Sequence, residues 1–303
     1  MPSRDLDAVF ARVAQLRDVV AVDELDGGLT NSNYRVQTAD GGDYVVRVAA
    51  PSSGLLAINR DLERQNTIAA WRAGVGAPVV AVLPDLDVLV VGFLRGRTLG
   101  ADDLADPALV DRISGAVRQL HAGPDFVGPW DMREIRRYYY SVVVDNRFRL
   151  PEGYEALARR VEALEDAMRP GDEQRVPCNN DLLPANFIDD GAKIWVIDYE
   201  YAGMNEASFE LGNMAAEAVL DDEETERLVF SYWERESRSK VARARAWSLL
   251  ARYGWTLWAS IQDGASDLDF DFWTWGMKKF DSAREELLGP RYDDIVAGLG
   301  IDD

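Results

Sequence analysis

Three polar residues in the second half of the chain have the types and the spacing that phosphoryl transfer requires. Asp181 is followed five residues later by Asn186, and Asp198 comes directly after the apolar run Ile194–Ile197. In such a centre one carboxylate orients the attacking hydroxyl and accepts its proton, while an amide oxygen and a second carboxylate present hard oxygens to magnesium on a triphosphate. Because aspartate and asparagine are common in turns, it is the coupling to the strand-ending aspartate that predicts a function.

A second set of residues, near the N-terminus, forms a candidate nucleotide site. The segment 25–34 (LDGGLTNSNY) is a small polar turn whose backbone N–H groups and hydroxyls can approach phosphates, although an ordinary hairpin turn has the same composition. Arg47 lies within an otherwise apolar strand signal, where an unpaired cation would be costly. Glu63 is its candidate partner, either in a purely structural ion pair or in the strand–helix pair that directs a cation to the α- and β-phosphates of a nucleotide.

The elements that must position these residues fall into two groups. Apolar stretches at 19–22, 34–36 and 44–48, separated by turn signals, predict an antiparallel sheet, followed by a helix at 58–72 and strands at 77–83 and 88–91. Helical signals then dominate at 107–121, 152–168, 223–236 and 241–262, with strand signals near 187 and at 194–197. We expect an α+β fold of two lobes, a mainly β nucleotide-binding lobe (1–95) and a mainly α catalytic and substrate-binding lobe (96–303).

Length and composition agree with a two-lobed enzyme. At 303 residues the chain exceeds the size at which one hydrophobic core usually stops growing, and clefts between lobes are favoured ligand sites. There is no apolar run of about 20 residues and no signal-peptide pattern, so we expect a cytoplasmic protein. One cysteine and one histidine exclude an internal disulfide and cysteine- or histidine-cluster metal sites, which leaves oxygen ligands as the metal chemistry.

The charge of the chain restricts its partners. A formal net charge of −20 disfavours nucleic acid and anionic membranes, since both carry the same sign. It suits a cationic small molecule, although a solvated acidic surface is the simpler interpretation of the charge taken alone.

The segment from Asn179 to Glu217 resembles the choline/ethanolamine kinase family, through 179–187, 197–205 (IDYEYAGMN) and 209–213 (FELGN). That family has the two-lobed, protein-kinase-like fold of the aminoglycoside phosphotransferases, and the resemblance covers nearly the whole chain. It implies ATP and Mg²⁺ as cofactors, Asp181 as the catalytic base, and Asn186 and Asp198 as the magnesium ligands. The nucleotide-binding residues that it implies are Gly28, Thr30, Asn31, Ser32, Asn33, Arg47, Glu63, Phe93 and Leu94.

Two positions depart from the family pattern. Asn179 stands where the family usually has histidine, and Glu210 where it usually has aspartate. In kinase folds the first position shapes the catalytic loop and the second anchors that loop from a helix. The changes therefore bear on rate and loop geometry more than on reaction type, and they leave a weakened or inactive kinase as an alternative.

Aromatic residues near the C-terminus are candidates for the substrate pocket. Trp255 and Trp258 share one face of a predicted helix, a pattern that usually marks a core, but the faces of such rings also bind ammonium groups by cation–π attraction. They resemble the W-x-x-W of choline kinases, and 270–275 (FDFWTW) resembles the aromatic segment that follows it. By this resemblance the substrate-binding residues are Glu200, Tyr201, Glu217, Trp255, Trp258, Phe272 and Trp275.

The sequence therefore predicts transfer of the ATP γ-phosphoryl group to the hydroxyl of a small amino alcohol, with choline first and ethanolamine next. One alternative is a kinase of another hydroxylated amine, such as an aminoglycoside, thiamine or an amino sugar. The other is a non-catalytic module that binds a nucleotide or an amine.

Overall fold

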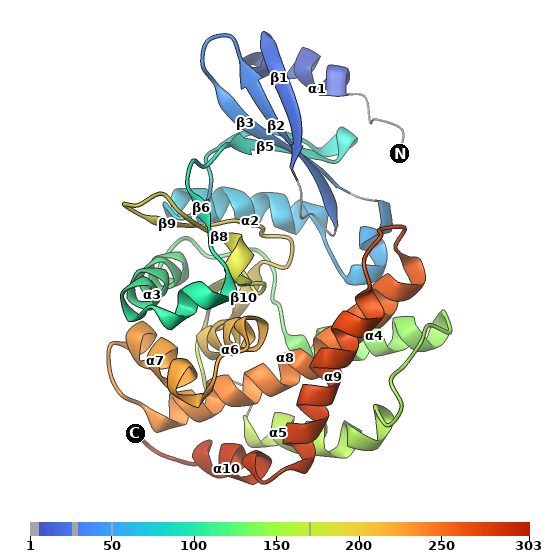
Figure 1. Cartoon of the computed structure of the whole chain (residues 1–303), viewed down its shortest axis with the longest axis vertical. Coiled ribbons are helices and arrows are strands. Elements are labelled where there is room, and N and C mark those ends of the chain that lie inside the picture. Colours follow the sequence, from blue (N-terminus) through green and yellow to red (C-terminus); the bar gives the residue numbers. More distant parts are fainter. Residues whose placement is uncertain (1–5, 26–29, 50, 170) are drawn as a thin grey trace.

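A computed structural model describes residues 6–25, 30–49, 51–169 and 171–303. Figure 1 shows two lobes, a small N-terminal lobe built around a sheet and a larger helical lobe beneath it. The predicted α+β, two-lobed fold class is confirmed. Gly28, predicted to contact the nucleotide, lies outside the described residues.

The N-terminal lobe is an antiparallel sheet with one main helix. The strands are β1 (Val19–Leu25), β2 (Asn31–Thr38), β3 (Asp43–Ala49), β4 (Val79–Leu83) and β5 (Val88–Gly92), in the order β1-β2-β3-β5-β4. Buried valines from β2, β3 and β5 form the core of the sheet with residues of α1 (Leu6–Arg12). Helix α2 (Arg60–Arg72) begins at Asn59, whose side chain accepts hydrogen bonds from the first free backbone N–H groups.

The C-terminal lobe combines helices with short strands. Its strands are β6 (Arg97–Thr98), β7 (Arg175–Cys178), β8 (Phe187–Asp189), β9 (Ile194–Val196) and β10 (Gly203–Glu206). Its helices are α3 (Pro107–His121), α4 (Met132–Asp145), α5 (Ala158–Ala167), α6 (Ala207–Ala218), α7 (Asp222–Trp233), α8 (Arg238–Ala265), α9 (Phe272–Leu288) and α10 (Arg291–Gly298). The long helix α8 runs through this lobe and packs against α4, α6 and α9 (Figure 1). Among the described residues no helix is both long enough and apolar enough to cross a bilayer.

Most predicted elements are present, with shifted ends. The strand signals and the helix at 107–121 are found as predicted, and the helix at 241–262 lies within α8. The helix predicted at 152–168 is wrong in its first part, because 155–157 form a separate 3₁₀ turn before α5. Helix α7 ends at Trp233 rather than at residue 236, since Glu234 adopts a left-handed conformation with φ of 52°.

Candidate active site

The loop between β7 and β8 carries Asp181 and Asn186, and Asn179 ties it to the segment that follows β9. The Asn179 side-chain amide donates to the backbone oxygens of Asp198 at 2.7 Å and Ile197 at 3.2 Å, and its oxygen accepts from the Asp181 N–H at 3.0 Å. Asparagine has a donor and an acceptor on one planar group, so it can hold both segments at once. With asparagine in place of histidine, this position still joins the loop of Asp181 to the segment of Asp198.

Glu210 anchors the same loop from helix α6. Asn180 has φ of 66°, and its N–H donates to Glu210 Oε1 at 2.7 Å. Glu210 is fully buried, and its other oxygen lies 2.5 Å from His121 Nε2. His121 Nδ1 in turn lies 2.7 Å from the Tyr232 hydroxyl, so the loop is connected to helices α3, α6 and α7. Cys178, beside this cluster, is buried with a thiol pKa raised well above its ordinary value by burial, which makes it inert packing.

Asp181, Asn186 and Asp198 are brought together by backbone contacts. The Asn186 amide nitrogen donates to the Asp181 backbone oxygen at 2.8 Å, which leaves the Asn186 side-chain oxygen available, and the Ile197 N–H donates to the Asn186 backbone oxygen at 3.0 Å. Asp198 has φ of 62°, and such left-handed residues cluster at functional sites. Its carboxylate keeps about a third of its surface exposed, with a side-chain exposure of 32%.

The charges of this centre favour a cation. Burial raises the pKa of Asp181 well above its ordinary value, and the negative charges of Asp198 and Glu217 raise it further. Asn186 and Asp198 offer an amide oxygen and carboxylate oxygens, which are the hard ligands that magnesium prefers. The residues therefore fit a Mg²⁺ ion, although the sheet cation Arg47 also contacts Asp198.

Arg47 joins β3 of the small lobe to this centre. Its Nη2 lies 2.6 Å from Asp198 Oδ1, 3.3 Å from Glu200 Oε2 and 3.4 Å from Glu63 Oε1. Burial alone would lower the pKa of Arg47, but the carboxylates more than offset it and the pKa is raised, so the guanidinium stays charged. The predicted pair with Glu63 is present. The shorter contact with Asp198 joins residues 151 positions apart, and no local pattern in the sequence indicated it.

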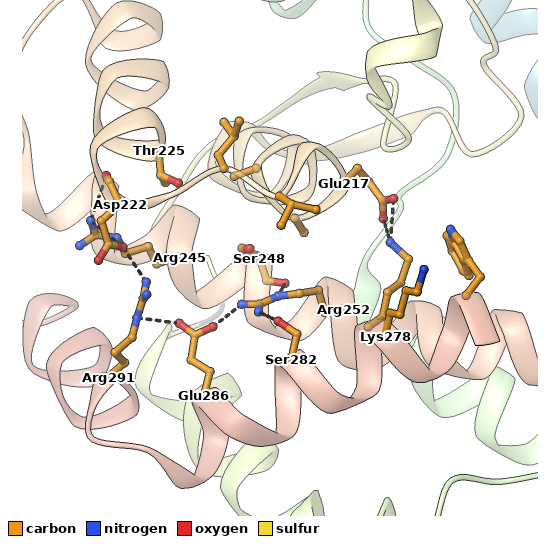
Figure 2. Close-up of a pocket in the computed structure, with 16 residues that line it drawn as sticks. Glu217, Asp222, Thr225, Arg245, Ser248, Arg252, Lys278, Ser282, Glu286 and Arg291 are labelled. Atoms are coloured by element: carbon orange, nitrogen blue, oxygen red, sulfur yellow. Dashed lines mark hydrogen bonds and ion pairs between the residues drawn. The ribbon is translucent and has the colours of Figure 1, made fainter. Parts of the chain in front are cut away.

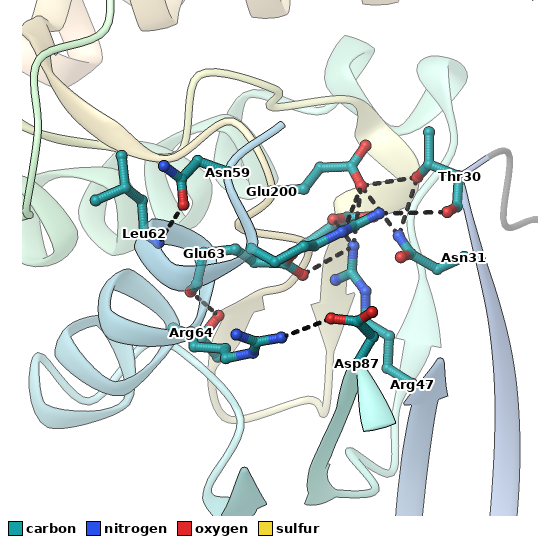
Figure 3. Close-up of polar contacts among 12 residues, drawn as sticks. Thr30, Asn31, Arg47, Asn59, Leu62, Glu63, Arg64, Asp87 and Glu200 are labelled. Atoms are coloured by element: carbon teal, nitrogen blue, oxygen red, sulfur yellow. Dashed lines mark hydrogen bonds and ion pairs between the residues drawn. The ribbon is translucent and has the colours of Figure 1, made fainter. Parts of the chain in front are cut away.

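Glu200 is the centre of a polar network between the lobes (Figure 3). Its Oε2 accepts from the Thr30 hydroxyl at 2.7 Å and the Asn31 amide at 3.0 Å, and it lies 3.6 Å from Arg60 Nη1. Burial and the neighbouring Asp198 raise the pKa of Glu200 to about 7, against the opposing effect of Arg47. Thr30 and Asn31, predicted for the nucleotide, thus contact a residue predicted for the substrate.

The remaining predicted nucleotide residues lie along the small lobe. Ser32 and Asn33 are half-buried in β2, where Asn33 pairs with Arg47 of β3. Phe93 and Leu94 follow β5 and are also half-buried. The Phe93 N–H donates to the Asp43 backbone oxygen at 2.9 Å, and the Arg35 guanidinium carbon lies 4.1 Å from the centre of the Phe93 ring.

The predicted aromatic residues converge between α8, α9 and the segment after β9. The Trp258 indole nitrogen donates to the Tyr201 hydroxyl at 2.9 Å, and its ring lies 5.7 Å from Phe272 and 5.5 Å from Trp275, between ring centres. The Trp255 ring lies 5.4 Å from Tyr201, and its nitrogen donates to Asn213 at 2.7 Å. Trp275 is half-buried whereas the other four rings are buried.

Glu217 has a partner that sequence reasoning missed. Lys279 Nζ lies 2.7 Å from each Glu217 carboxylate oxygen, and 4.2 Å from the centre of the Trp275 ring. In Figure 2 a dashed line leaves each of the two carboxylate oxygens of Glu217, and these are its two bonds to Lys279. The sequence holds one signal for this contact: Trp275 and Lys279 are four residues apart and so share a helical face. The signal can be used only if α9 is recognised as a helix.

The site combines a candidate base, oxygen ligands for a metal and a cation on a strand of the small lobe. These are the features of small-molecule phosphotransferases, and solved phosphotransferases have a similar fold. The chain matches the choline/ethanolamine kinase family model over residues 22–244. It therefore belongs to the choline/ethanolamine kinase family, whose members are phosphotransferases that act on an alcohol group.

Individual relatives agree with this assignment. The chain is 25% identical to probable choline kinase 1 of Arabidopsis thaliana, covering 87% of this chain and 86% of that protein. It is 27% identical to ethanolamine kinase 2 of Mus musculus, covering 62% of this chain and 56% of that protein. The structure of a choline/ethanolamine kinase family protein from Mesorhizobium loti is similar with a TM-score of 0.82 and 25% identity, covering 97% of this chain and 98% of that one.

Proposed function

We propose that this protein transfers the γ-phosphoryl group of ATP, with Mg²⁺, to the hydroxyl of choline or ethanolamine. The observation that carries the proposal is that the loop of Asp181 and Asn186 is bonded to the segment of Asp198, and that the charges of Asp198 and Glu217 both act on the Asp181 pKa. A base near both a metal ligand and an amine-binding carboxylate is what transfer to an amino alcohol requires.

In this mechanism Asp181 aligns the substrate hydroxyl and accepts its proton. Asn186 and Asp198 would hold Mg²⁺, which supplies neutralisation of charge on the phosphates. Asn179 and Glu210 fix the backbone at Asp181 and at the residue before it, through the Asp181 and Asn180 N–H groups, so the carboxylate does not need to reorganise during the reaction.

The nucleotide would lie against the small lobe. Arg47, held charged on β3, supplies a cation for the phosphates. Asn31, Ser32 and Asn33 start strand β2 beside it, and Thr30 directly precedes that strand. Phe93 and Leu94 follow β5 at the connection to the second lobe, where a purine ring can pack. A solved choline kinase, LicA, in complex with AMP has a similar fold, with a TM-score of 0.75 at 22% identity.

The aromatic residues beside Glu217 indicate the kind of acceptor. Tyr201, Trp255, Trp258, Phe272 and Trp275 form a continuous group of rings beside Glu217, which suits a compact ammonium group by cation–π attraction. An aminoglycoside with several amines would need an open acidic groove, and Glu217 and Glu200 are both buried. Choline and ethanolamine are the acceptors that match this enclosure.

The test is an assay of ADP release with ATP and Mg²⁺ across choline, ethanolamine, thiamine and aminoglycosides. We expect turnover with choline or ethanolamine, and a loss in kcat of roughly 10³-fold in Asp181→Asn, since general-base catalysis typically contributes 10²–10⁴-fold. Asp190→Asn, an exposed carboxylate between β8 and β9, serves as the matched control and should keep full activity. Undiminished turnover in Asp181→Asn would refute the role of Asp181, and turnover on aminoglycosides alone would refute the acceptor.

A further inference from the structure

Lys279 and Glu217 form a buried ion pair at the edge of the proposed amine pocket. The lysine ammonium contacts both carboxylate oxygens at 2.7 Å, and the two side chains are only 11% and 6% exposed. The pair joins α9 to α6 across 62 residues of sequence. Burying two charges is costly unless both are paired, so this contact is a specific feature of the pocket wall.

The surroundings of the lysine ammonium are those expected for a substrate ammonium. On one side is the Glu217 carboxylate and on the other the face of Trp275, whose ring centre is 4.2 Å away. A carboxylate and an indole face are the two groups that bind alkylammonium ions in water. Trp275 also contacts Trp258, which is hydrogen-bonded to Tyr201, so the ammonium lies at the aromatic group described above.

The pair is also within electrostatic reach of the reacting group. The Glu217 charge raises the pKa of Asp181, whereas the Lys279 charge lowers it. The charges of the pair therefore act on the proposed catalytic base.

We propose that the Lys279 ammonium occupies the site of the substrate ammonium, so that Lys279 is an internal competitor that the amine must displace from Glu217 and Trp275. This inference rests on the proposed function, because it concerns the amine subsite of that reaction. In the absence of an amine the lysine compensates the buried Glu217 charge, and with the amine bound the substrate nitrogen takes over that role.

The structure provides room for the displaced side chain. A hollow of about 520 Å³ is lined by Glu217, Trp275 and Lys279 at one end and continues toward Arg252 and Arg291 (Figure 2). The four-carbon stem of lysine is flexible, so the ammonium can move into this hollow by rotamer changes alone. Because the hollow also carries Arg245 and Lys278, it is a less favourable place for the ammonium than Glu217, and displacement costs binding energy.

Binding of tetramethylammonium tests the inference. This ion has no hydroxyl, so its binding, followed by tryptophan fluorescence, is measured independently of phosphoryl transfer and of the proposed kinase activity. We expect Lys279→Met to bind it about tenfold more tightly than the unmodified protein, because the competitor is gone. Arg284→Met removes one positive charge from an exposed position of α9 that does not line the hollow, and it should leave the affinity unchanged.

Two further variants keep the test decisive. If Lys279→Met does not fold, because Glu217 is left buried and unpaired, Lys279→Gln retains a hydrogen-bond donor for Glu217 and should show the same gain. Glu217→Gln with Lys279→Met removes the carboxylate as well and should lose the gain. Equal or weaker binding by Lys279→Met or Lys279→Gln would overturn the inference, and would assign Lys279 a purely structural role.

Discussion

At the scale of single residues, the carboxylate of Glu210 contacts two partners at once. Its oxygens reach Asn180 N–H at 2.7 Å and His121 Nε2 at 2.5 Å, in a fully buried position. The departure from aspartate adds one methylene, which lets the carboxylate span both partners from α6. The loop that carries Asp181 is therefore anchored from α6 by a buried carboxylate.

Glu210→Ala should lower the free energy of unfolding by about 3 kcal/mol, since a buried N–H and a buried imidazole both lose their partner and a small cavity remains. Chemical denaturation measures this change. Glu223→Ala, on the exposed face of α7, should change stability by no more than about 0.5 kcal/mol. Equal stability of the two variants would contradict the anchoring role.

At the scale of elements, helix α6 carries three side chains that bind other parts of the site. Glu210, Asn213 and Glu217 are spaced by three and four residues and so lie on one face, from which they reach the catalytic loop, Trp255 and Lys279. Gly212, also on α6, lies where helix α8 packs so closely that there is no room for a side chain. A Cβ atom at that position would lie 2.2 Å from the Ala244 backbone oxygen, which no relaxation of a side chain can relieve.

Gly212→Ala is expected to destabilise the protein by about 2 kcal/mol or more, as overpacking against backbone forces α6 and α8 apart. The matched control is Gly115→Ala in α3, where the nearest atom to the new Cβ is 3.9 Å away. That variant should gain up to about 1 kcal/mol from helix propensity. Thermal unfolding of both separates the two effects, and a stabilised Gly212→Ala would show that the helices do not pack as described.

At the scale of the whole molecule, the two lobes are joined through Glu200. Its carboxylate accepts from Thr30 and Asn31 of the small lobe and lies near Arg47 and Arg60, all from residues 30–60. These bonds therefore hold residues 30–60 of the small lobe against the second lobe.

Glu200→Gln should loosen the small lobe, because a neutral amide weakens the charge-assisted bonds to Thr30, Asn31 and Arg47. We expect amide hydrogen exchange in β2 and β3 to become roughly tenfold faster, which corresponds to about 1.4 kcal/mol. Glu165→Gln is the control, since Glu165 is equally buried and ion-paired but its partners, Arg136 and Arg137, lie within the second lobe. Faster exchange in both variants alike would mean that Glu200 has no special role between the lobes.

Much of this fold could be predicted because its signals are local. Strands β2, β3 and β5 and helix α3 have regular apolar spacing and clear turn or cap residues, and the spacing of Asp181, Asn186 and Asp198 spans only 18 positions. Helix α6 was not predicted, because it is buried almost all round and so lacks an amphipathic pattern. Helix α9 begins within an aromatic segment that gave no helical period.

The sequence by itself predicted the reaction type and the two-lobed fold, because these depend on short-range spacing and local apolar patterns, and its resemblance in motifs such as 179–187 and 197–205 predicted the family. Only the tertiary structure decided which charged and polar side chains contact one another. Arg47 meets Asp198, Glu200 meets Thr30 and Asn31, and Lys279 meets Glu217, over separations of 151, 170, 169 and 62 residues. Such pairs depend on how helices and lobes pack, and with 33 cations and 53 carboxylates in the chain, composition leaves the pairing open.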